Sequence, residues 1–145
     1  MQEKENKRKQ TTRLIITVGV ALILVVLVQF FFYKSTNALN SEITELVGKY
    51  NKNCPLIIQS GIRLDSVSLP EAKVAQYNLT LLHVEKQTAD VRLIKSEIEK
   101  SLVSTAKANP GLQAFRDNGY ALIYSYSDQK KVFLFKIVIG PDQYK

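Results

Sequence analysis

The sequence predicts an α+β domain over residues 40–145, preceded by one N-terminal transmembrane helix. Three observations support this fold class: an uncharged apolar run, two segments with helical apolar spacing, and four segments in which apolar residues alternate. The order in the domain is helix, two strands, helix, two strands. A four-stranded antiparallel sheet with both helices on one face buries both helical stripes most simply, as a circularly permuted ferredoxin-like sandwich, αββαββ.

The uncharged run, Leu14–Tyr33, has the twenty residues that a helix needs to span a bilayer. Residues 1–13 form a basic tail, which predicts a cytoplasmic N-terminus, and residues 34–39 form a linker. The extracytoplasmic domain then follows a single pass through the inner membrane. The residues expected to hold the anchor at its two ends are Leu14, Phe30, Phe31, Phe32 and Tyr33.

Two alternatives to a permanent anchor remain open. One is a cleaved signal peptide, for which Thr36-Asn37-Ala38 offers a weak cleavage site. The other is a buried helix of a soluble protein. The anchor is favoured because the apolar core is longer than that of a signal peptide and ends in bulky aromatic residues.

The first αββ unit begins with a short helix capped by Asn40 or Ser41. Its apolar positions, spaced as i, i+3, i+4 and i+7, are Ile43, Leu46, Val47 and Tyr50. A loop punctuated by Pro55, Ser60 and Gly61 leads to an alternating strand over 62–67. After a turn at 69–71, a second strand over 76–81 puts Tyr77, Leu79 and Leu81 on one face.

The second unit begins with the clearest helix of the domain, from about Ala89 to Lys107. Thr88 is its expected cap, and its stripe consists of Val91, Ile94, Ile98, Leu102 and Thr105. Asn109-Pro110-Gly111 ends this helix, and a turn over 115–119 leads to a hairpin of strands 120–126 and 132–139.

The predicted sheet has 74–82 and 132–139 as central strands, because the last strand is the most apolar, and 62–67 and 120–126 as edges. On this arrangement one sheet face has no covering helix and is a candidate contact surface for a partner protein. Its expected contact residues are Leu122, Tyr124, Tyr126, Leu134 and Lys136. The alternative is that the tyrosines face inward and pack.

Composition narrows the chemistry. The chain carries +7, but the 14 basic and 11 acidic residues after residue 38 are interspersed, so nucleic-acid binding is not expected. Cys54 and His83 are the only Cys and His, which excludes an internal disulfide and the common zinc sites. We find no motif for acyl transfer, phosphate binding or metal-dependent hydrolysis. We therefore expect no catalytic residues, no cofactor and no metal.

Strand-like patterns resemble those of small exported bacterial proteins without an assigned function. The residues that carry this resemblance are 63–67, 76–81, 115–117 and 124–126. It implies a bacterial extracytoplasmic domain and no catalytic residue. The order of basic tail, single span and two αββ units is similar, in architecture only, to that of inner-membrane assembly proteins of type II secretion and type IV pilus systems.

The sequence thus favours a membrane-anchored domain that binds other envelope proteins, or a second copy of itself, without catalysis. An extracytoplasmic domain that senses a small ligand is the alternative. That alternative predicts a sizeable cavity beneath Phe133, Phe135 and Ile98.

Overall fold

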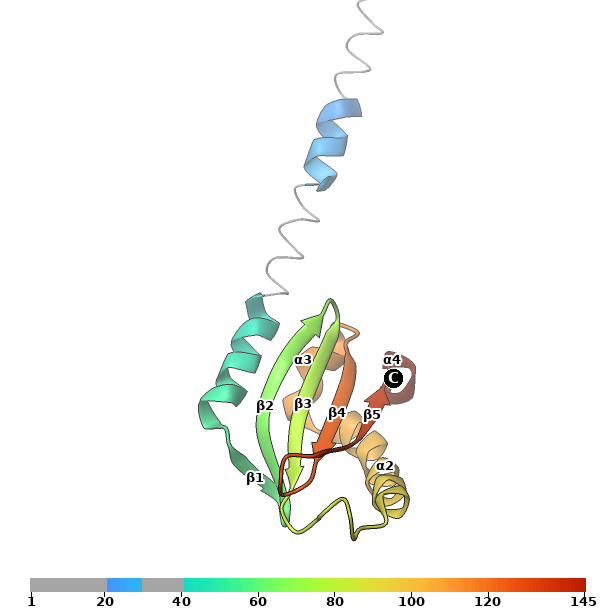
Figure 1. Ribbon diagram of the computed structural model, residues 1–145. Coiled ribbons are helices and arrows are strands. Elements are labelled where there is room, and N and C mark those ends of the chain that lie inside the picture. Colours follow the sequence, from blue (N-terminus) through green and yellow to red (C-terminus); the bar gives the residue numbers. More distant parts are fainter. Residues whose placement is uncertain (1–20, 30–40) are drawn as a thin grey trace, which may run out of the picture. The chain divides into compact units, whose positions relative to one another are not determined.

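The computed structural model describes residues 21–29 and 41–145. The chain divides into two compact units, Met1–Ser41 and Glu42–Lys145. A helix over 41–53, which belongs to the second unit from Glu42 onward, precedes the labelled elements of Figure 1. These are β1 (Leu56–Gln59), β2 (Ile62–Glu71), β3 (Val74–Leu81), α2 (Val91–Ala108), η1 (Pro110–Leu112), α3 (Gln113–Asp117), β4 (Ala121–Ser127), β5 (Phe133–Ile139) and α4 (Pro141–Tyr144).

The predicted α+β class is confirmed, but the predicted sheet is wrong in strand number and topology. The sheet has five strands in the order β1-β2-β3-β4-β5 and is mixed, because β3 and β4 run parallel while the other pairs are antiparallel. The chain returns from β3 to β4 through α2, in a crossover that parallel strands require. A ferredoxin-like order, with β3 beside β5, is therefore excluded.

Three strand positions differ from prediction as a result. β5 is an edge strand although it is the most apolar, and β4 lies inside the sheet between β3 and β5. β2 is not an edge either, because β1 pairs outside it over residues expected to form a loop. β2 also continues to Glu71, so that the hairpin turns at Lys73, which has φ of +59°.

The two helices predicted from apolar spacing lie where that spacing placed them. In the helix over 41–53, Ile43 and Val47 are buried in the core, as their spacing predicted. Asp90, rather than Thr88, caps α2, and its carboxylate accepts the Leu93 N–H at 3.1 Å. At the other end Arg116 of α3 donates to the carbonyls of Ala106 and Asn109, which supplies partners for the last turn of α2.

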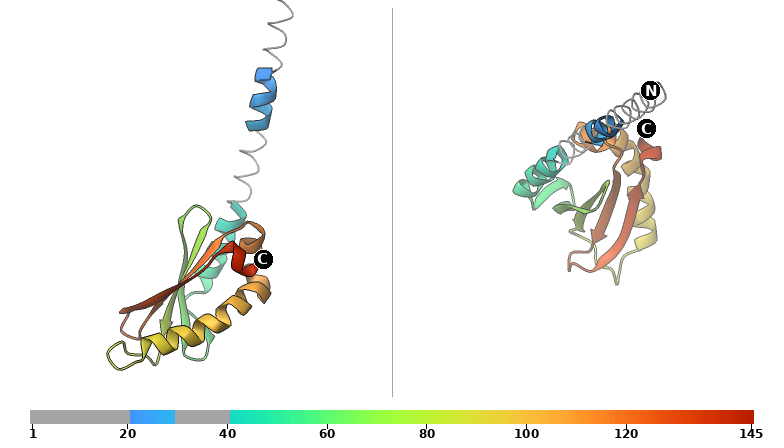
Figure 2. Two further views of the ribbon diagram at one scale, coloured as in Figure 1. Left: turned by 90° about the vertical axis from the view of Figure 1, so that its right-hand side faces the viewer. Right: turned by 90° about the horizontal axis from the view of Figure 1, so that it is seen from above.

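The core lies between the sheet and the helices. Register partners place Leu64, Tyr77, Tyr124 and Ile137 on the same, covered face of the sheet, and all four are buried. Figure 2 shows α2 running along one side of the sheet. α4 closes the end of the domain, where the buried Tyr144 hydroxyl donates to the Tyr120 carbonyl.

The predicted membrane anchor falls mostly outside the described residues. Residues 21–29 form a helix with exposed aliphatic side chains. The five expected anchor residues, Leu14 and Phe30, Phe31, Phe32 and Tyr33, lie outside the described part. Within residues 21–29 and 41–145, no helix combines the length and the apolar character that crossing a membrane requires.

Candidate functional site: a tyrosine-lined groove

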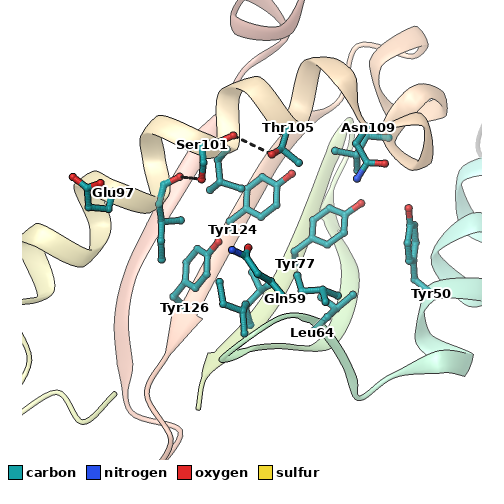
Figure 3. Close-up of a pocket in the computed structure, with 16 residues that line it drawn as sticks. Tyr50, Gln59, Leu64, Tyr77, Glu97, Ser101, Thr105, Asn109, Tyr124 and Tyr126 are labelled. Carbon is teal, nitrogen blue, oxygen red and sulfur yellow. Dashed lines mark hydrogen bonds between the residues drawn. The ribbon is translucent and has the colours of Figure 1, made fainter. Parts of the chain in front are cut away.

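A groove of about 480 Å³ opens on the covered face of the sheet, between α2, β1 and the helix over 41–53 (Figure 3). All these elements contribute to its walls, and β2, β3 and β4 form its floor. The lining side chains are Tyr50, Ile58, Gln59, Ile62, Leu64, Tyr77, Leu79, Glu97, Ile98, Ser101, Leu102, Thr105, Asn109, Leu112, Tyr124 and Tyr126. Glu97 is the one charged residue among them, so the groove suits an uncharged ligand.

Aromatic stacking makes the groove floor rigid. Tyr77 and Tyr124 are register partners on the parallel strands β3 and β4, and their rings stack at 5.2 Å with an interplanar angle of 14°. The Phe115 ring meets Tyr77 edge-on at 6.3 Å from the neighbouring α3. Offset-stacked and edge-to-face pairs are the favoured aromatic geometries, so these side chains hold one another in place.

The side of α2 that faces the groove is only partly buried. The predicted stripe faces the sheet, but Val91, Ile94, Ile98 and Leu102 are only half-buried, and Thr105 is exposed. Ala106 is the only buried residue of the helix. The Ser101 and Thr105 hydroxyls donate back to the carbonyls of Ile98 and Ser101 within the helix. These two hydroxyls therefore donate within the helix and do not require a hydrogen-bond acceptor from a ligand in the groove.

The opposite wall, formed by the helix over 41–53, is held in place by hydrogen bonds from two of its residues. The Asn51 side chain pairs with the backbone of Val67 in β2, donating to its carbonyl at 2.9 Å and accepting its N–H at 2.8 Å. From the preceding residue, the Tyr50 hydroxyl donates to the Gly111 carbonyl at 2.9 Å. The helix over 41–53 is thus tied to the strand beside it and to the segment that follows α2.

Burial keeps the floor tyrosines protonated. Burial raises the pKa of Tyr124 to about 12 and raises the pKa values of Tyr77 and Tyr126 as well. At neutral pH these groups are neutral phenols that can donate a hydrogen bond. The Tyr77 hydroxyl oxygen is buried and has no hydrogen-bond partner within the described residues.

The sequence placed Leu122, Tyr124, Tyr126 and Leu134 on an open face of the sheet, and this placement is wrong. All four side chains are buried, and of the five residues only Lys136 is exposed. The reason is the hairpin register: Tyr126 lies opposite Phe135 and Tyr124 opposite Ile137, so they share the covered face. Tyr124 and Tyr126 therefore face inward, as the alternative expected, and they also line the groove. Their role in partner contact stays a prediction.

The open face of the sheet is mostly polar. Gln76 donates to Asn78, which donates to Ser66, in a chain of side-chain hydrogen bonds across β3 and β2. Nearby, Asp65 accepts from Arg63, Thr80 and Lys131 at 2.5–2.7 Å. These groups satisfy one another, so this face offers less apolar surface than predicted.

The apolar surface that the open face lacks lies at the other edge of the sheet. Leu56, Ile57 and Ile58 in β1 are each about half exposed, at 47–55%. Ile58 also lines the groove. Three consecutive exposed aliphatic residues on an edge strand are unusual, because such edges readily pair with another chain. The sequence does not predict this strand, because the four residues of β1 show no alternation of apolar and polar side chains.

Neither Cys54 nor His83, the only Cys and His of the sequence, lines the groove. Cys54 is a free thiol whose pKa is raised by burial and by the nearby Asp65 carboxylate. A raised pKa disfavours the thiolate, which is the nucleophilic form. In the described part of the chain, no three His, Cys, Asp or Glu side chains gather as metal ligands would.

A family model matches residues 38–135, and its description is a domain of unknown function, DUF8479. No curated protein matches the sequence. The resemblance to inner-membrane assembly proteins stays a prediction.

Three solved structures share the fold. A secreted protein of Pseudomonas aeruginosa superposes with a TM-score of 0.61 at 14% identity, covering 74% of this chain and 94% of its own. The pilotin EpsS of the Vibrio vulnificus type 2 secretion system gives 0.60 at 8% identity, covering 75% and 94%. The type II secretion pilotin AspS of Vibrio cholerae gives 0.57 at 9% identity, covering 74% and 93%. At these identities the likeness concerns the fold.

Proposed function

This chain belongs to the DUF8479 family, and we propose that it is a cell-envelope protein that binds a segment of another protein in the tyrosine-lined groove. The groove is the observation that carries the proposal. It is preformed, lined by uncharged side chains except for Glu97, and bordered by an exposed aliphatic edge strand. That the same fold occurs in two pilotins and in a secreted protein supports an envelope role.

A protein segment is favoured over a small molecule because the apolar surface continues beyond the groove. Ile58 belongs both to the groove wall and to the exposed edge formed by Leu56 and Ile57. A ligand that filled only the groove would leave this edge uncovered. A polypeptide can cover both, and exposed apolar patches of this kind commonly mark protein contacts.

The proposal includes a single-pass anchor over Leu14–Tyr33, with the N-terminus in the cytoplasm and the domain outside the inner membrane. Anchoring raises the effective concentration of the domain near other membrane proteins, so modest affinity suffices. A dual reporter of alkaline phosphatase and fluorescent protein fused after Lys145 tests the orientation. Phosphatase activity without fluorescence is expected; the reverse result would contradict it.

The partner itself is sought by photo-crosslinking in cells, with a benzophenone amino acid at Ile58 on the groove rim. The matched position is Leu93 of α2, which is 60% exposed but does not line the groove. A discrete adduct is expected from position 58 and none from position 93. We expect no catalytic activity to accompany binding.

A pair of α2 variants shows whether the adduct depends on the groove. Ser101 and Ser104 are both exposed on α2, but only Ser101 lines the groove. Ser101→Trp fills the groove and should abolish the adduct, whereas Ser104→Trp should not. If both variants retain the adduct, the groove is not the binding site.

A small-ligand domain is the second candidate, favoured by one observation: the groove volume falls within the range of small-molecule pockets. Ile98 lines it, as that alternative expected, whereas Phe133 and Phe135 do not. Native mass spectrometry of protein released from membranes would reveal a retained small molecule. A stoichiometric adduct of defined mass would favour this candidate over the protein partner.

A further inference from the structure

Tyr77 is the one groove residue with a buried, unmet polar group. Its side chain is 6% exposed, and its hydroxyl oxygen has no hydrogen-bond partner in the part of the chain that the structure describes. Figure 3 shows this hydroxyl pointing away from the sheet, toward the space between Tyr50 and Asn109 at the end of α2. A buried hydroxyl without a partner is costly, so a partner supplied by a ligand gains more there than at a satisfied site.

Tyr50 is the polar neighbour of this hydroxyl. Burial and then the nearby Tyr50 hydroxyl raise the pKa of Tyr77, but the two hydroxyls do not meet in a hydrogen bond of normal length and angle. The Tyr50 ring lies edge-on to Tyr77, with 6.1 Å between centroids, while its own hydroxyl donates to Gly111. The Tyr50 side chain is only half-buried, and its bond to Gly111 is at the surface. The Tyr50 side chain can therefore rotate away from Tyr77 with the loss of one exposed hydrogen bond, the one to the Gly111 carbonyl.

We propose that the groove recognises a neutral carbonyl group on an apolar segment of the partner, that Tyr77 donates its hydroxyl proton to this carbonyl, and that Tyr50 moves aside to admit it. The inference rests on the proposed function and specifies the chemistry of its ligand. A carbonyl is favoured over a carboxylate because no cationic side chain lines the groove, while Glu97 adds a negative charge. A main-chain carbonyl or a side-chain amide would both serve.

Two small probes isolate the carbonyl. Acetanilide carries a phenyl ring and an amide carbonyl, and N-ethylaniline has the same skeleton with a methylene group in place of the carbonyl. Each is titrated into the full chain in lipid nanodiscs of phosphatidylethanolamine and phosphatidylglycerol, and the NMR shifts of the Leu64 and Leu79 methyl groups report groove occupancy. We expect acetanilide to bind at least about fivefold more tightly than N-ethylaniline.

Three variants test whether the preference for acetanilide depends on the Tyr77 hydroxyl and on the position of Tyr50. Tyr77→Phe should bind both probes equally and unfold at nearly the same denaturant concentration as the native chain, because the lost hydroxyl makes no hydrogen bond of normal geometry and has only its contact with Tyr50. Tyr124→Phe, which removes a neighbouring hydroxyl from the same floor, should keep the preference. Gly111→Ala should tighten acetanilide binding, because a Cβ at Gly111 would lie 2.8 Å from the Tyr50 hydroxyl and displace it.

Other outcomes separate the failure of this inference from that of the proposed function. Equal binding of the two probes by the native chain overturns the role of Tyr77 and leaves the groove as a binding site. A Tyr77→Phe variant that keeps the preference but is less stable also overturns it, since the hydroxyl would then be bonded within the fold. If neither probe shifts the methyl signals, both this inference and the proposed groove fail.

Discussion

At the scale of single residues, Asp128 shows how one buried carboxylate organises the connection between β4 and β5. It is 2% exposed, and its oxygens accept the backbone N–H groups of Lys130 at 2.8 Å, Val132 at 2.9 Å and Lys86 at 3.1 Å. The last bond ties the loop after β3 to this turn. Burial alone would raise the pKa of Asp128, but these N–H donors outweigh it and lower the pKa below its ordinary value of 3.8.

This lowered pKa predicts an acid-dependent loss of stability. A carboxylate with a lower pKa in the folded chain stabilises the fold fully above the unfolded value of 3.8, and this contribution disappears as pH falls through the folded pKa. Asp128→Asn should be less stable than the native chain at pH 7, and the difference should shrink below pH 3.8. Urea denaturation across pH measures it, and a constant difference at all pH values would contradict it.

Phe115 is the largest fully buried apolar side chain of the described residues, and it tests the contribution of core packing to stability. It is fully buried, and its ring contacts those of Tyr77 and Tyr120 edge-on. Phe115→Ala should destabilise the domain by about 3–5 kcal/mol, because it leaves a cavity under the groove floor. Phe133→Ala, at a residue that is 48% exposed, should cost less than about 1 kcal/mol. Chemical denaturation compares the two, and equal losses would place Phe115 outside the core.

At the scale of elements, α2 is held to the sheet by few contacts. Ala106 is its only buried residue, and the apolar stripe is left half-covered above the groove. The space between this half-covered stripe and the aromatic floor is the groove.

The burial of Ala106 can be tested directly. Ala106→Leu adds bulk at the one buried position of α2 and should cost about 1–3 kcal/mol of unfolding free energy. Ala108→Leu, two residues later and exposed, should change it by less than about 0.5 kcal/mol. Guanidinium denaturation followed by circular dichroism measures both. Should the two variants unfold alike, α2 would not be anchored at Ala106.

At the scale of the whole molecule, the parallel pairing of β3 with β4 determines the arrangement of the groove. It brings Tyr77 beside Tyr124 although 46 residues separate them in sequence. In the antiparallel sheet that the sequence suggested, β3 would instead lie beside β5, and the two tyrosines would be on different faces.

Engineered cysteines distinguish the two sheets. Asn78 and Ser125 are register partners across β3 and β4, whereas Lys136 is a partner of Ser125 on β5. With Cys54→Ser as background, the pair Asn78→Cys and Ser125→Cys should be joined by a short bismaleimide in the full chain. The pair Asn78→Cys and Lys136→Cys should react less, because β4 lies between them. Preferential joining of the second pair would restore the ferredoxin-like order. Mass spectrometry of the digested chain identifies the products.

Local apolar patterns sufficed to place the helices over 41–53 and 91–108 and four of the strands, because a helix or strand buries one face with its own period. The same patterns could not choose strand neighbours, since pairing depends on contacts between segments far apart in the chain. They also could not determine which face of β4 is covered by the helices. Both faces of this strand carry apolar residues, and only the pairing of Tyr126 with Phe135 decides between them.

β1 forms through its pairing with β2, so it has no periodic signal of its own. The α+β class and the candidate tyrosines were thus determined by the sequence. The groove that gathers them was decided by the tertiary structure, because it is a space left between elements and not a property of any one of them.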